Sequence, residues 1–137
     1  MKRYALDSGP IVALLNGRDT FHRWARETLD TLAPPLFTCE AVISEACFLL
    51  RHTASGSDAV LELVERDLLR VDFRSGEQIE SLGKSMRKYK GVPMSFADAC
   101  LVRMSELDPE LSIVTLDSDF RVYRRLGRRL IPVVSPS

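Results

Sequence analysis

The chain has 137 residues, of which 45% are hydrophobic and 28% are charged, and its 19 basic and 19 acidic residues give a formal net charge of zero. This length and balance are typical of one globular domain over residues 1–137, and they argue against a disordered chain. The zero net charge gives no indication of a nucleic-acid partner, so any such indication must come from where the charges lie.

The sequence also lacks the marks of membrane and secreted proteins. No apolar run approaches the roughly 20 residues that span a bilayer, and no apolar signal segment follows the basic residues at the start. The three cysteines are odd in number and form no C-x-x-C pair, which favours neither a disulfide framework nor a zinc site. We therefore expect a reduced, cytoplasmic protein without a membrane segment.

Strand and helix patterns alternate along the first half of the chain. The apolar run at residues 4–6 predicts a buried strand that ends at Asp7, and Pro10 suits the first turn of the helix that follows it. The elements predicted next are a helix at residues 20–32, a strand at 36–38 and a helix at 40–52.

The second half continues the alternation. Helices are predicted at residues 57–67, 76–89 and 95–107, and strands at 69–73, 112–116 and 130–134. Pro132 cannot donate a ladder hydrogen bond, so we place the last strand at an edge. Five strand candidates separated by helices predict an α/β fold with a parallel sheet covered by helices on both faces.

Two acidic residues, Asp7 and Asp117, each follow a β-rich run. Ligands of parallel α/β sheets bind at the carboxyl ends of strands, near the point where strand order reverses, so these two carboxylates could converge although 110 residues separate them. Each could instead serve only a local turn or helix cap. Asp119 is expected mainly to cap the short helix that follows it.

Two further acids lie in helical segments. Glu45 has apolar neighbours on both sides, and a carboxylate partly buried in that way is rare unless it is paired or binds a metal. Asp98 lies three residues after Ser95, a spacing that predicts a capping box. Taken alone, Asp98 is explained better by the cap than by metal binding.

Taken together and in this order, the motifs resemble the PIN-domain family, and most closely its VapC-type toxin ribonucleases. The matching stretches span the chain and are residues 5–15, 43–45, 95–99 and 114–120. The first motif departs from many members by reading Asp-Ser-Gly-Pro, which concerns the first helical turn and leaves the acid itself unchanged.

The resemblance implies a three-layer α/β/α PIN-like fold with a central parallel sheet of about five strands, and an acidic pocket for Mg²⁺ or Mn²⁺. Its acids fall on Asp7, Glu45, Asp98 and Asp117, with Asp119 as a further acid near the metal. Ser8 and Thr115 are assigned accessory roles. Carboxylates suit hard cations, and such ions activate water for attack on a phosphodiester, giving 5′-phosphate and 3′-hydroxyl ends.

Two basic clusters are candidates for holding phosphate. The first follows Asp117, and its spacing would put it on one helical face if a helix continued past Gly127. The second lies just before Ser95. The residues that we assign to RNA binding are Arg121, Arg124, Arg125, Lys84, Arg87 and Lys88. Both clusters could equally be solvated surface.

Other functions fit the motifs less well. Asp117-Ser118-Asp119 resembles the Asp-x-Asp of haloacid-dehalogenase-type phosphatases, but it follows a late strand instead of the first. Receiver domains need a pair of acids at the first strand, which this chain lacks. A PIN-domain nuclease of RNA processing and a non-catalytic PIN-like module that binds RNA or protein remain alternatives to a toxin.

A protein partner is also expected. The predicted helices at residues 20–32 and 40–52 carry more large apolar side chains than one buried face needs, so we expect part of this surface to be covered in a homodimer or by a small antitoxin. These side chains are Phe21, Trp24, Leu29, Phe48, Leu49 and Leu50.

Overall fold

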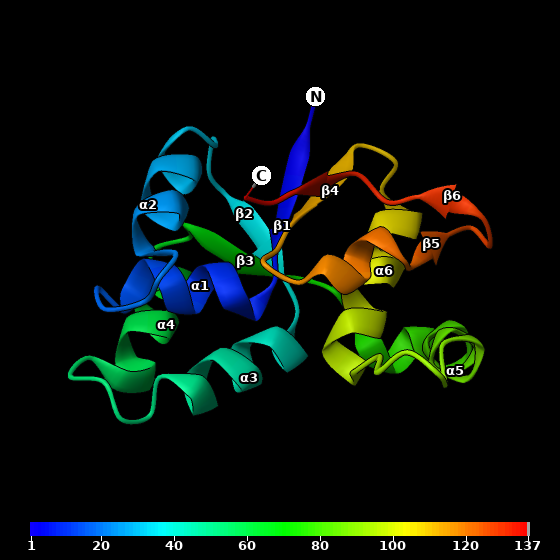
Figure 1. The fold of residues 1–137 in the computed structure, drawn as a ribbon, viewed down its shortest axis with the longest axis horizontal. Coiled ribbons are helices and arrows are strands. Elements are labelled where there is room, and N and C mark those ends of the chain that lie inside the picture. The colour runs from blue at the N-terminus through cyan, green and yellow to red at the C-terminus, as the bar shows by residue number, and fades with distance from the viewer. Residues whose placement is uncertain (137) are drawn as a thin grey trace.

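A central parallel sheet organises the computed structural model, which describes residues 1–136. Its five strands stand in the order β3-β2-β1-β4-β7, and every neighbouring pair is parallel (Figure 1). The strands are β1 (Arg3–Leu6), β2 (Leu36–Thr38), β3 (Leu69–Val71), β4 (Leu111–Val114) and β7 (Val133–Val134). The predicted α/β class and sheet are confirmed.

Helices cover the sheet on both sides. In Figure 1, α1, α2 and α4 lie to the left of the sheet and α5 and α6 to the right. The helices are α1 (Ser8–Leu15), α2 (His22–Asp30), α3 (Glu40–Leu49), α4 (Gly56–Glu65), α5 (Ile79–Lys88), which follows the 3₁₀ turn η1 (Ser75–Gln78), and α6 (Phe96–Leu107). None of these helices is long and apolar enough to cross a membrane.

The core lies where the two helical layers meet the central strands. All four residues of β4 are buried, as expected for a strand that is covered on both faces. Two of the largest fully buried side chains, Phe120 and Tyr123, come from the segment after β4 and not from a long helix or a sheet strand. This short segment therefore contributes to the core together with the sheet.

The arginine-rich C-terminal segment differs from the prediction. The proposed single helix is wrong: the 3₁₀ turn η2 (Ser118–Arg121) is followed by an antiparallel hairpin of β5 (Arg124–Arg125) and β6 (Arg129–Leu130). Leu126 and Gly127 have φ values of 51° and 83°, which end any helix and reverse the chain. The arginines therefore do not share a helical face. The predicted strand at 130–134 is also split, because Ile131 and Pro132 separate β6 from β7.

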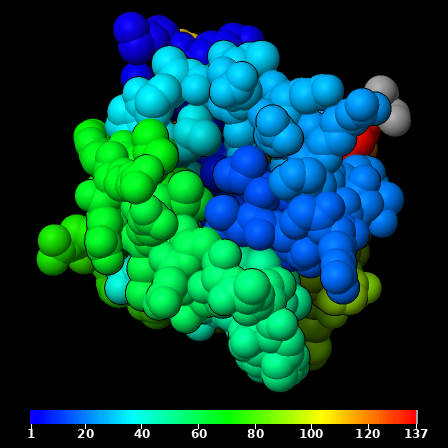
Figure 2. All heavy atoms as spheres, turned by 90° about the vertical axis from the view of Figure 1, so that its left-hand side faces the viewer, coloured from blue at the N-terminus to red at the C-terminus, as the bar shows by residue number. Residues whose placement is uncertain are grey.

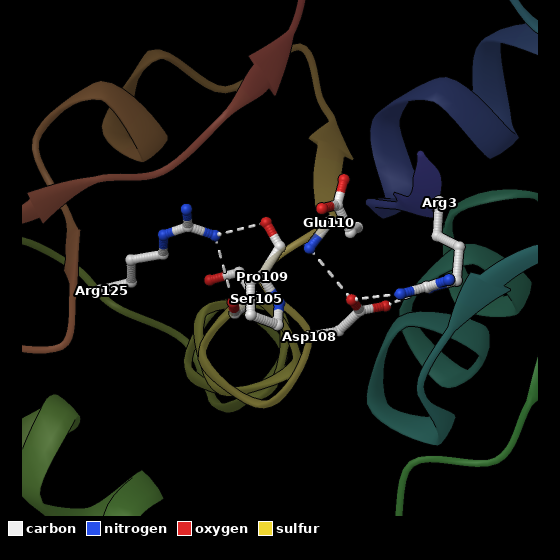
Figure 3. Close-up of polar contacts among 6 residues, drawn as sticks. All are labelled: Arg3, Ser105, Asp108, Pro109, Glu110 and Arg125. Carbon is white, nitrogen blue, oxygen red and sulfur yellow. Dashed lines mark hydrogen bonds and ion pairs between the residues drawn. The ribbon is translucent and has the colours of Figure 1, made fainter. Parts of the chain in front are cut away.

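Two arginines fasten other segments to the end of α6 (Figure 3). Arg3 binds both carboxylate oxygens of Asp108, with Nε–Oδ2 and Nη2–Oδ1 distances of 2.5 and 2.7 Å. Nη1 of Arg125 donates to the carbonyl oxygens of Ser105 and Pro109 at 3.3 and 3.5 Å. Cations suit the negative end of a helix dipole. Arg125 therefore turns inward and holds the hairpin against α6.

Candidate active site

Asp7 occupies the carboxyl end of β1, the strand from which the sheet extends in both directions. The residue is 6% exposed. Oδ1 caps α1 by accepting the Ser8 amide at 2.8 Å, and Oδ2 accepts the Thr115 hydroxyl at 2.7 Å. The predicted local cap at Asp7 is present, but it uses only one oxygen.

Thr115 joins this carboxylate to the end of the neighbouring strand β4. Its side chain is fully buried, and its hydroxyl oxygen also accepts the Asp117 amide at 2.9 Å. β2 lies on one side of β1 and β4 on the other, so Asp7 and Asp117 flank the point at which strand order reverses. Asp117 in turn caps η2 by accepting the Asp119 amide at 2.8 Å. The cap predicted at Asp119 therefore belongs to Asp117.

We expect Thr115→Val to destabilise the protein by about 1–3 kcal/mol, because a buried carboxylate oxygen of Asp7 and the Asp117 amide each lose their partner. Urea denaturation without added metal measures this change. Thr115→Ser keeps the hydroxyl and is the matched control, with a smaller loss from the missing methyl group. Equal losses in the two variants would show that the hydroxyl contributes nothing.

Glu45 comes from α3, the helix that follows β2. Its side chain is half-buried, as predicted from its apolar neighbours, and its Oε1 accepts a hydrogen bond from the Ser8 hydroxyl. Ser8 thereby connects the first turn of α1 to α3. Glu45 is close enough to Asp7 for the two charges to repel each other and to raise the pKa of Asp7.

Asp98 lies in the first turn of α6 and does close the predicted capping box. Its amide donates to Ser95 Oγ at 3.0 Å, and its Oδ2 accepts the Ser95 amide at 3.5 Å. The residue is only 8% exposed, and its carboxylate repels both Asp7 and Asp117. The Asp98 side chain can therefore close the capping box and belong to the acidic cluster in one and the same position.

Burial and mutual repulsion shape the electrostatics of this cluster. Burial, and to a smaller extent the charges of Asp98 and Glu45, raise the pKa of Asp7 to about 6, against the lowering effect of the hydrogen bonds from Thr115 and Ser8. Burial also raises the pKa of Asp98, opposed by its hydrogen bonds and assisted by repulsion from Asp117. A cation in this region would stabilise the ionised carboxylates of Asp7 and Asp98 against burial and mutual repulsion.

The chemistry of the donors fits a hydrated hard cation better than a fully enclosed one. Over residues 1–136, no group of three or more His, Cys, Asp or Glu side chains is arranged so that it could hold a metal ion. The convergent side chains offer oxygen atoms alone, and Mg²⁺ keeps several waters while binding one or two carboxylates directly. His22 is engaged elsewhere, with Nδ1 2.8 Å from the Ala13 carbonyl oxygen.

The two predicted basic clusters meet at one place although they share no helix. Nζ of Lys88 on α5 donates to the Gly127 carbonyl at 2.7 Å and so joins α5 to the hairpin. Arg121 contacts Ser135, Arg124 contacts nearby backbone carbonyls, and Lys84 lies 3.8 Å from Glu80. Within the described part of the chain, no arginine from 121 to 129 pairs with a carboxylate.

Sequence reasoning missed one residue of the site. The hydroxyl of Tyr123 donates to Asp98 Oδ2 at 3.0 Å, and its ring is fully buried. The available signal was an aromatic residue three positions after Phe120 within an otherwise basic segment. The spacing of the arginines around it predicts a basic surface and gives no indication that the tyrosine contacts an acid.

Comparisons with known proteins agree with this architecture. The family model described as PIN domain matches residues 4–126. The crystal structure of Mycobacterium tuberculosis VapC20, described as a sarcin-ricin loop cleaving toxin, is 21% identical with a TM-score of 0.75, and the match covers 92% of this chain and 98% of that one. DNA-bound VapBC from Salmonella typhimurium is 16% identical with a TM-score of 0.60 and 98% coverage of both chains. No curated protein matches the sequence.

Proposed function

Because this chain belongs to the PIN-domain family, we propose that it is a Mg²⁺- or Mn²⁺-dependent endoribonuclease and the toxin of a VapBC-like pair. The proposal is supported by the charge repulsion that links Asp7 to Glu45 and Asp98, and Asp98 to Asp117, side chains that come from four separate segments near the reversal point of the sheet. We assign this activity to residues 1–137 as one domain that works in the cytoplasm.

The four acids would hold the ion, in part through water, and Asp119, whose amide binds Asp117, would be a further acid near it. When bound, such an ion makes a nucleophilic water available near neutral pH and stabilises the charge that develops on the phosphate. Thr115 fixes the carboxylate of Asp7, and Ser8 fixes that of Glu45. Hydrolysis in this arrangement leaves 5′-phosphate and 3′-hydroxyl ends.

Incubation with structured RNA tests the activity. We expect cleavage with Mg²⁺ or Mn²⁺, none with a chelator, and products that a 5′-phosphate-dependent exonuclease degrades. Binding of RNA without cleavage under every metal condition would favour the non-catalytic module instead, although the presence of all four acids supports an active enzyme. A small reading frame immediately upstream would favour the toxin over a role in RNA processing.

We assign RNA binding to the exposed cations of α5 and of the η2–hairpin segment. Arginines without a carboxylate partner are suited to phosphate oxygens. Lys84, Arg87 and Lys88 belong to α5, whereas Arg121 and Arg124 belong to the segment that Lys88 joins to it. Arg125 instead fixes the hairpin, since its Nη1 donates to the carbonyl oxygen of Ser105 on α6.

The double variant Arg87→Gln/Arg121→Gln is expected to weaken RNA binding. It should also reduce the slope of log K against log salt concentration by about 1.4, because each phosphate contact on a single strand contributes about 0.7 to that slope. Filter binding in a chelator measures this without cleavage. Arg23→Gln/Arg66→Gln removes the same charge from α2 and from the C-cap of α4 and is the control. An unchanged slope in the first variant contradicts the assignment.

The protein partner is supported by part of the predicted apolar surface. Phe48, Leu49 and Phe21 are 60%, 51% and 40% exposed, whereas Leu29 and Leu50 are buried and Trp24 packs against the core. Figure 2 also shows a hollow of about 360 Å³ between α2 and α4, which other residues line, among them Leu14, Leu29 and Leu63. We propose that a second copy or an antitoxin covers the exposed side chains of Phe21, Phe48 and Leu49. A strict monomer in light scattering that binds no antitoxin would contradict it.

A further inference from the structure

Tyr123 is held so firmly that its hydroxyl has a defined direction. The ring is fully buried and meets Phe120 and Tyr89 edge-on, with centroid distances of 5.3 and 5.1 Å. Tyr89 is fixed in turn, because its hydroxyl oxygen accepts the Arg124 amide at 2.8 Å. Edge-to-face aromatic pairs of this kind restrict a ring in addition to burying it. The hydroxyl cannot leave its place without disturbing the packing of this segment.

The hydroxyl of Tyr123 has two acceptors in reach, at unequal strength. Asp98 Oδ2 lies 3.0 Å away and the Pro93 carbonyl oxygen 3.2 Å away. An ionised carboxylate is the stronger acceptor. The Tyr123 hydroxyl therefore donates its single proton mainly to Asp98 and only secondarily to the Pro93 carbonyl oxygen.

The capping box alone holds the Asp98 carboxylate weakly. Its contact with the Ser95 amide is 3.5 Å, at the outer limit for a hydrogen bond, whereas the tyrosine contact is 0.5 Å shorter (3.5 against 3.0 Å). Both contacts use Oδ2. Among the described residues, Oδ1 of Asp98 accepts no side-chain or amide hydrogen bond.

We propose that Tyr123 is a positioning residue of the active site, whose hydroxyl binds Oδ2 of Asp98 and thereby leaves Oδ1 for the metal ion. This inference rests on the proposed function, since it takes Asp98 as a metal ligand. Removing a group that hydrogen-bonds to a metal ligand and orients it typically lowers metal affinity 10- to 100-fold. A tyrosine that merely fills the core would change stability and leave metal affinity unaltered.

The test is Tyr123→Phe, which deletes the hydroxyl and keeps the ring. We expect a folded protein whose Mn²⁺ dissociation constant, measured by calorimetry and by Mn²⁺-induced thermal shift, rises about 10- to 100-fold. In cleavage assays the Mn²⁺ concentration for half-maximal activity should rise, while KM for RNA at saturating Mn²⁺ stays the same. Tyr89→Phe removes a hydroxyl from the same aromatic cluster without touching an acid, and it should bind Mn²⁺ like the wild type.

The outcomes separate the two proposals. A wild-type protein that binds no Mn²⁺ or Mg²⁺ overturns the proposed function. A wild type that binds Mn²⁺ beside a Tyr123→Phe variant that binds it equally well overturns only the positioning role. If Tyr123→Phe fails to fold, a crystal structure of the wild type with Mn²⁺ decides: the ion on Oδ1 with Tyr123 on Oδ2 supports the role, and the ion on Oδ2 overturns it.

Discussion

Asp98→Asn is expected to abolish RNA cleavage, by roughly 100-fold or more, in a protein that stays folded. Removing an outer partner of a metal ligand already costs 10- to 100-fold, so loss of the ligand's charge should cost at least as much. The amide can keep its oxygen in the place of Oδ2, where it still accepts from Ser95 and Tyr123. Only Oδ1, the atom without a hydrogen-bond donor, is replaced by an amino group.

The measurement is paired: thermal melting without metal, and RNA cleavage with Mg²⁺ or Mn²⁺. Without metal, the variant should lose at most about 1 kcal/mol of stability relative to the wild type, which is the usual contribution of a helix cap. Loss of one repelling charge could even raise the melting temperature. Asp58→Asn, in the first turn of α4 and exposed, is the matched control and should cleave normally. Wild-type cleavage by folded Asp98→Asn would refute the mechanism.

The second large effect concerns Asp7 and pH. Its pKa in the folded protein is about 6, raised from an ordinary value of 3.8. A carboxyl group with a raised pKa stabilises the fold below its unfolded pKa, and this stabilisation is lost as pH rises through the folded pKa. In metal-free protein the loss should occur between about pH 4 and 6 and reach on the order of 3 kcal/mol above that range.

Asp7→Asn isolates this contribution, because the amide does not titrate. Its stability relative to the wild type should improve from pH 4.5 to 7.5 in urea denaturation with a chelator, whatever constant cost arises from the altered contact with Thr115. Asp58→Asn should show no such trend. Mn²⁺ should stabilise the wild type increasingly as pH rises, since metal and proton compete, and it should stabilise Asp7→Asn little at any pH. A stability difference that does not vary with pH would contradict the shifted pKa.

Local patterns of the sequence were sufficient for most of the sheet and its helices. Apolar runs placed β1, β2 and β4, and the Ser95–Asp98 spacing placed the start of α6, because these features depend on neighbouring residues. Tertiary contacts decided the remaining features. The arginine segment has helical spacing, yet the positive φ at Leu126 and Gly127 and the inward turn of Arg125 produce a hairpin.

In the candidate site, too, some features could be predicted from local sequence and others depend on the folded chain. The motifs named the acids, but no spacing could show that Thr115 joins Asp7 to the Asp117 amide across 108 residues. Nor could it show that Asp98 serves as a cap and a cluster member at once. The role of Tyr123 could not be predicted either, because its partner Asp98 lies on α6 and only the folded chain brings the tyrosine hydroxyl to it.

The bond between Thr115 and Asp7 also sets a time for the enzyme during synthesis. β1 carries the first acid of the chain, but its partner β4 ends at Val114, and Asp117 follows that strand. At about 5–20 residues per second, a ribosome needs roughly 5–20 s to pass from the first of these acids to the last. During that interval the nascent chain carries an incomplete set of acids. On the proposed function, an antitoxin supplied during these seconds would therefore be present before the first complete active site forms.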